Sequence, residues 1–190
     1  RLLGLLAASE RLRELAQVPF MLALMCSYDD DEELPVRRAA LIRTCVHALL
    51  RRRPLSQDLG FDHDRLATLL TNVADRLFRI NSSGGHGEAE FLFAIQAYLT
   101  VEPRRDRGHR FTAPHDFAEL ILDEIVERTG LLQRDGEFID FVHRSIWEFF
   151  VATALVERGA DAVSEVAGGS AWEEPIRLLL GLVEEPLVRA

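Results

Sequence analysis

The position of His143 suggests binding chemistry. It follows two short apolar runs, Leu131–Arg134 and Glu137–Val142, and stands where a helical pattern begins. The first turn of a helix carries unpaired N–H groups and the positive end of the helix dipole, so it favours an anion such as phosphate. A histidine there adds an N–H donor whose charge changes near neutral pH. Position alone favours a plainer interpretation, in which His143 caps the strand end or satisfies a neighbouring carbonyl.

The elements that must position His143 are a β-hairpin and a helix. Asp135-Gly136 separates the two apolar runs and fits a two-residue type I′ turn, in which both central residues need positive φ. Ile139 and Phe141 share one face of the second strand. The helical face that follows consists of Ile146, Phe149, Phe150, Thr153 and Ala154. The pattern predicts a hairpin that leads directly into an amphipathic helix.

Other combinations of reactive side chains are poor candidates for a site. A P-loop needs a lysine to reach the β- and γ-phosphates, and all 22 basic residues are arginine. We therefore expect no ATP hydrolysis by this chain alone and no catalytic residue in it. Cys45 and His47 face different sides of a helix, and His86, His109 and His115 lack zinc-ligand spacing, so no metal ligand is predicted.

Composition indicates a globular protein. The chain has 190 residues, 48% of them hydrophobic and 28% charged, with a net charge of −9. This acidity argues against general binding to nucleic acid or an anionic membrane. No apolar run is long enough to span a membrane, so we expect a cytoplasmic protein. Cys26 and Cys45 lie in helical patterns and are predicted to be buried reduced thiols.

Residues 1–56 are predicted to form a small helical domain. Ser9 can cap a helix to Gln17, and Pro19 opens a second helix to Tyr28. Residues 2–8 are interpreted as the tail of a helix from a longer chain, and 29–33 as a solvated acidic loop. Pro35 is expected to start a long helix that ends near Arg53. Its buried stripe is predicted to be Ala39, Ile42, Val46, Leu49 and Leu50.

Residues 57–160 are predicted to form a winged-helix domain, because helices precede the hairpin. An acidic cap leads into a helix to about residue 80, with Leu66, Leu69, Leu70, Val73, Leu77 and Ile80 inward. We expect a flexible loop at 81–87, a helix at 88–99 and a basic loop at 103–110. Asp116 is expected to cap a helix over 117–129, with Phe117, Leu120, Ile121 and Ile125 inward, and Gly130 to end it.

Residues 161–190 are predicted to begin a further helical region. Two helical stretches are expected there, near 161–167 and 172–183. The predicted fold class is therefore mainly α: a small helical domain, a winged helix with one β-hairpin, and the start of more helices.

Three segments in order resemble one known family. The first segment is Leu15–Leu22, which includes Pro19. The second is Leu34-Pro35 followed by Arg38, and the third runs from Phe141 to Ala152. They are similar to three parts of the NACHT-type STAND NTPases, the nucleotide switches of NLR-like immune receptors and their bacterial relatives. These parts are the proline segment of the first helical domain, a Leu-Pro-x-x-Arg helix start, and the signature that closes the winged-helix domain. The signature residues matched are Phe141, His143, Glu148, Phe150 and Ala152.

The resemblance implies a regulatory module that closes over ADP or ATP and controls signalling, in bacterial defence or a related pathway. The P-loop NTPase domain would lie N-terminal to Arg1, and a sensor or repeat region would follow the C-terminal end. The parent protein would form a homo-oligomer on activation. By resemblance, Pro19 packs against the adenine or lines that side of the pocket, and His143 donates a hydrogen bond to the β-phosphate of ADP. Pro19 as a plain first helical residue remains open, and Glu148 is interpreted as holding its helix in place.

Two alternatives remain. The first is a DNA-binding winged helix whose recognition helix would be 116–129, although acidic residues far outnumber basic ones there. The second is a purely structural helical interaction module. A P-loop encoded upstream would favour the nucleotide switch over both.

Overall fold

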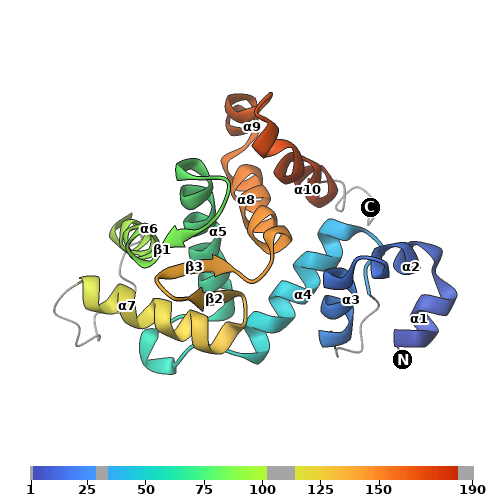
Figure 1. Cartoon of the computed structure of the whole chain (residues 1–190), viewed down its shortest axis with the longest axis horizontal. Coiled ribbons are helices and arrows are strands. Elements are labelled where there is room, and N and C mark those ends of the chain that lie inside the picture. The colour runs from blue at the N-terminus through green and yellow to red at the C-terminus, as the bar shows by residue number, and fades with distance from the viewer. Residues whose placement is uncertain (1, 29–33, 102–113, 184–190) are drawn as a thin grey trace.

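The computed structural model describes residues 2–28, 34–101 and 114–183. These residues form a mainly helical structure with one small antiparallel sheet (Figure 1). The loops expected at 29–33 and 103–110 lie outside the described residues. No described helix has both the length and the apolar composition needed to cross a membrane.

The first four helices are α1 (Leu2–Ala8), α2 (Glu10–Ala16), α3 (Pro19–Ser27) and α4 (Arg38–Arg52). Two of them, α2 and α3, begin where the sequence predicted. The Ser9 hydroxyl accepts from the Leu12 N–H at 3.3 Å, and Pro19 is the first residue of α3. The predicted start of α4 at Pro35 was wrong. Leu34 is buried in the core, and the chain reaches α4 through the extended backbone of Arg37.

Next come a 3₁₀ turn (Gln57–Leu59), α5 (His63–Ile80), β1 (His86–Gly87) and α6 (Glu88–Val101). Asp62 is the predicted acidic cap and accepts from the Arg65 N–H at 2.8 Å. The predicted loop at 81–87 was wrong only at its last two residues, since 81–85 form no helix or strand. Residues 86 and 87 pair with the hairpin as β1, and the Gly85 N–H donates to the Asp140 carboxylate.

The segment before the hairpin differs in detail from its prediction. It is α7 (Pro114–Glu124) followed by a π-helical turn, Ile125–Thr129. Asp116 lies inside α7 and does not cap it, because the helix already begins at Pro114. Leu120 is 37% exposed because Leu122 takes its place in the core. Gly130 ends the segment in the left-handed conformation, with a φ of 67°, as predicted.

The sheet contains β2 (Leu132–Asp135) and β3 (Phe138–Phe141) in the order β1-β3-β2. Asp135 pairs with Phe138, so the turn residues are Gly136 and Glu137, and the type I′ turn at Asp135-Gly136 was wrong. Among the described residues only glycines have positive φ, so Asp135 cannot take the conformation that a type I′ turn requires. Gly136 alone supplies a positive φ, of 62°, the sign pattern of a type II′ turn.

The helix α8 (Arg144–Arg158) lies at the centre of the molecule (Figure 1) and packs against α4, α5 and α10. Its buried surface is wider than the predicted face and includes Trp147, whose indole N–H donates to the Ala74 carbonyl at 3.0 Å. After α8 the chain forms α9 (Ala160–Val166), a 3₁₀ turn (Ser170–Trp172) and α10 (Glu173–Val183). These two helices confirm the predicted C-terminal helical stretches.

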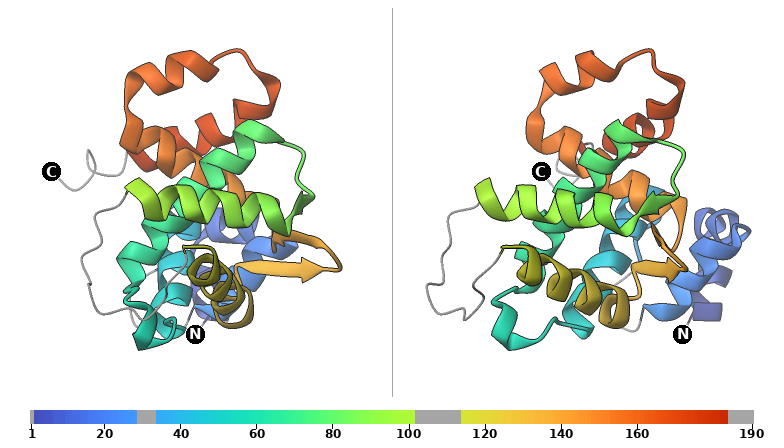
Figure 2. Two further views of the ribbon diagram at one scale, coloured as in Figure 1. Left: turned by 90° about the vertical axis from the view of Figure 1, so that its left-hand side faces the viewer. Right: turned by 60° about the vertical axis from the view of Figure 1, so that its left-hand side comes forward.

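The buried side chains form one continuous core from Leu12 to Leu179. Figure 2 shows α9 and α10 together at one end of the molecule, above α8. This core crosses both predicted domain boundaries, 56/57 and 160/161, so the division into three domains stays a prediction.

Two further predicted core side chains, Cys26 and Ile80, are exposed. Cys45 is buried, which raises the pKa of its thiol to about 12, whereas Cys26 is exposed, and both are free. Cys26 falls on the outer side of α3, because Met21, Leu24 and Met25 take the inner side. Ile80 is also exposed, because it is the last residue of α5.

Candidate functional site

His143 caps α8 through both its side chain and its backbone. Its Nδ1 accepts from the Ser145 N–H at 3.0 Å, and its carbonyl accepts from Ile146 at 3.0 Å and Trp147 at 3.4 Å. These N–H groups are therefore not free for an anion, which corrects the expectation from the helix start alone. Since Nδ1 accepts, the proton of the neutral ring lies on Nε2, which remains as a donor.

A stacked ring connects His143 to the Pro19 segment. Phe20, directly after Pro19, stacks on the His143 imidazole with centroids 3.7 Å apart and planes inclined by 2°. Pro19 itself is exposed and takes the plain first position of α3. The two predicted site residues thus lie in neighbouring parts of the structure, although they are far apart in sequence.

Arg38 is the side chain that sequence analysis missed as a site residue. It is the first residue of α4, and its Nη2 donates to the Ser145 hydroxyl at 2.9 Å. Its Nη1 forms an ion pair with Glu174 at the start of α10. A signal was present in the sequence: Arg38 lies in the first turn of the predicted helix, where a cation opposes the helix dipole.

Four helix N-termini therefore meet at this point. They are the starts of α3, α4, α8 and α10, represented by Phe20, Arg38, His143 and Glu174. Each contributes the positive end of a dipole, and Arg38 adds a full charge. We refer to Pro19, Phe20, Arg38, His143 and Ser145 as the junction site. These positive charges suit an anion, and the Glu174 carboxylate already pairs with Arg38 there.

The environment keeps the His143 ring neutral. Burial is the main cause that lowers the pKa of His143; the carboxylate of Glu148 raises it, and the cation of Arg38 lowers it. The net result is a pKa below the ordinary value for histidine. At neutral pH the ring is thus an uncharged cap with one donor at Nε2.

Glu148 and Arg144 hold the start of α8 in place. Arg144 Nε donates to Glu148 at 2.8 Å, and the guanidinium lies over the Trp147 ring at 4.8 Å. Arg144 also donates to the Ser82 carbonyl, which ties α8 to the segment before β1. These contacts support the interpretation of Glu148 as a structural residue.

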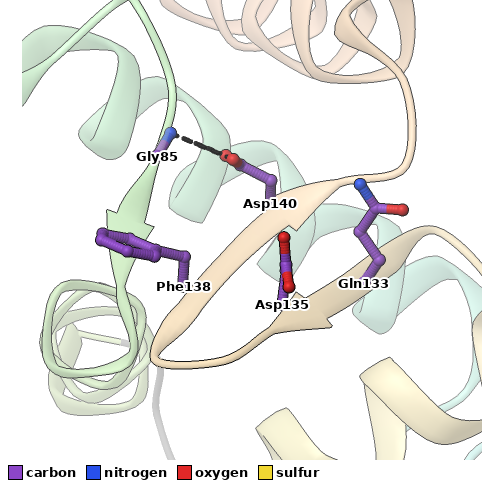
Figure 3. A pocket seen from close by; sticks show the side chains of 5 residues that line it. All are labelled: Gly85, Gln133, Asp135, Phe138 and Asp140. Carbon is purple, nitrogen blue, oxygen red and sulfur yellow. Dashed lines mark hydrogen bonds between the residues drawn. The ribbon is translucent and has the colours of Figure 1, made fainter.

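A surface pocket lies elsewhere, on the outer face of the hairpin. Figure 3 shows its lining residues: Gly85, Gln133, Asp135, Phe138 and Asp140. Both Asp140 oxygens already accept from the Gly85 N–H, at 3.1 and 3.0 Å. In the part of the chain that the structure describes, no three His, Cys, Asp or Glu side chains are grouped to hold a metal. The pocket therefore offers weaker binding chemistry than the junction site.

No protein-family model, curated protein or solved structure matches this chain. The sequence resemblance and the geometry of the junction site are therefore the grounds for assigning a function.

Proposed function

We propose that this chain is the regulatory module of a NACHT-type STAND nucleotide switch. In this proposal it closes over ADP that is bound to a P-loop domain outside this chain. The observation that carries the proposal is the Phe20–His143 stack. It joins the two segments in which the resemblance predicts adenine and phosphate contacts.

We infer that residues 57–160 form a winged helix. The order is helix, short strand, two helices and hairpin, from α5 through β1, α6 and α7 to β2 and β3. The short strand β1 pairs with β3 and completes a three-stranded sheet. This order is typical of winged-helix domains and supports the inference.

The junction-site residues suit the proposed roles. The Nε2–H of His143 would donate to the β-phosphate, and Pro19 would offer a rigid apolar surface to the adenine. Arg38 would add a positive charge beside the phosphate, from the start of α4. A hydrogen bond to a charged group contributes about 1.5–3 kcal/mol, so one histidine can bias a two-state switch.

The further parts of the proposal follow from the family resemblance. The parent protein would carry a P-loop domain before this chain and a sensor or repeat region after it. It would be cytoplasmic, exchange ADP for ATP on activation, and form a homo-oligomer that signals.

The first test is the nucleotide content of the parent protein. When it is purified without added nucleotide, acid extraction is expected to release ADP at close to one molecule per chain. The same extraction from the present chain alone is the control and is expected to release none, because without the P-loop domain the chain would not retain nucleotide through purification. A parent protein that carries no adenine nucleotide and does not bind added ADP would refute the proposal.

A further inference from the structure

Arg38 is shared between two elements at the junction site. One side of its guanidinium donates to Ser145 on α8, and the other pairs with Glu174 on α10. The Glu174 side chain is only 25% exposed, whereas that of its neighbour Glu173 is 67% exposed. Glu174 is thus a partly buried carboxylate that is held by the positive charge of Arg38.

We propose that Glu174 competes with nucleotide phosphate for Arg38, and so couples the docking of α10 to the junction site. This inference rests on the proposed function, because it takes the junction site as the phosphate site. While α10 is docked, Glu174 neutralises Arg38 and lowers the affinity for phosphate. When α10 moves away, Arg38 is free to pair with the phosphate.

The coupling must act in both directions. If docking of α10 weakens phosphate binding, then phosphate binding weakens docking of α10 by the same factor. The region that follows α10 in the parent could therefore sense the nucleotide, and a pull on that region would change nucleotide affinity.

The packing of α10 offers a second, independent way to test the coupling. A Cβ atom at Gly181 would lie 2.9 Å from the Cβ of Ala39 on α4, so α10 and α4 approach closely there. Gly181→Val is expected to push α10 away from α4 without altering either Arg38 or Glu174. If competition is the mechanism, this variant behaves like the removal of the Glu174 charge.

The test measures pyrophosphate binding to the present chain by isothermal titration calorimetry. Glu174→Gln and Gly181→Val are expected to bind about fivefold more tightly than the wild type, or better. Glu173→Gln is the matched control. It removes the same charge from the same helix and also an Arg177 contact, but Glu173 has no contact with Arg38. Its affinity is expected to stay at the wild-type value, and Arg38→Gln is expected to bind more weakly than the wild type.

Hydrogen exchange in α10 gives a readout without ligand. Amides of α10 are expected to exchange faster in Glu174→Gln than in Glu173→Gln. In the wild type they are expected to exchange faster with pyrophosphate than with sodium chloride at equal ionic strength.

Equal pyrophosphate affinity of Glu174→Gln and Glu173→Gln would overturn the competition, and so would an absence of binding in every variant. Failure of the proposed function gives a different result. In that case His143→Asn leaves pyrophosphate binding unchanged, while Glu174→Gln still strengthens it.

Discussion

At the scale of single residues, His143 combines a structural contact at Nδ1 with a donor at Nε2 that has no partner among the residues the structure describes. Nδ1 is fixed by the Ser145 N–H, and this bond leaves the proton on Nε2. The sequence predicted the helix start, because it depends on local pattern. The plainer alternative had His143 cap the strand end or satisfy a carbonyl, whereas its Nδ1 caps the helix. It could not predict the Phe20 stack or the approach of Arg38, because these contacts join segments that are distant in the chain.

Stability is expected to fall with acidification because of His143. Its folded pKa lies below the ordinary value of about 6.5. The unfolded chain therefore takes up the proton first, so stability is lost as pH falls from about 6.5 through the folded pKa. Protonation of Nδ1 would also remove the acceptor for Ser145. Above about pH 6.5 the ring is neutral in both states, and this effect is absent.

The matched variant is His143→Asn, since asparagine also caps helices well but does not titrate. Urea unfolding between pH 7.5 and pH 5 is expected to show a smaller loss of stability for this variant than for the wild type. Parallel losses in the two proteins would show that His143 does not contribute to the acid sensitivity.

At the scale of elements, the sequence predicted best the helices whose caps are local. Ser9 and Asp62 cap their helices by accepting from an N–H three residues on, and the fixed φ of Pro19 suits the first position of α3. Elements that depend on distant partners were missed. The strand β1 has two residues and exists through its pairing with β3, and no local periodicity marks so short a strand.

Gly130 is expected to be needed for the connection into the hairpin. Its φ of 67° ends the π-helical turn, and a side chain in that conformation costs about 1–2 kcal/mol. Gly130→Ala is therefore expected to lower the free energy of unfolding by that amount. Gly87→Ala is the control, because Gly87 does not have positive φ and a Cβ there meets no atom within 4 Å. Urea titration of both variants tests the expectation, which equal stabilities would contradict.

At the scale of the whole molecule, α4, α8 and α10 meet across the predicted domain boundaries. The order of the three family-like segments was readable from the sequence, but their convergence at the junction site was not.

Charge also acts at this scale and disfavours the DNA-binding alternative. The segment before the hairpin has one arginine, Arg128, which pairs with Glu124. Its acidic residues are Asp116, Glu119, Asp123, Glu124 and Glu127.

The most direct test of the nucleotide switch is the rate at which the parent protein releases ADP, compared between the wild type and His143→Asn. The variant keeps a capping side chain but loses the Nε2 donor. Loss of a hydrogen bond worth about 1.5–3 kcal/mol is expected to speed ADP release by about tenfold to a hundredfold. Size-exclusion chromatography is expected to show a larger oligomeric fraction, and circular dichroism an unchanged fold. An unchanged release rate and oligomeric state in a well-folded variant would contradict the proposal and leave His143 as a structural cap.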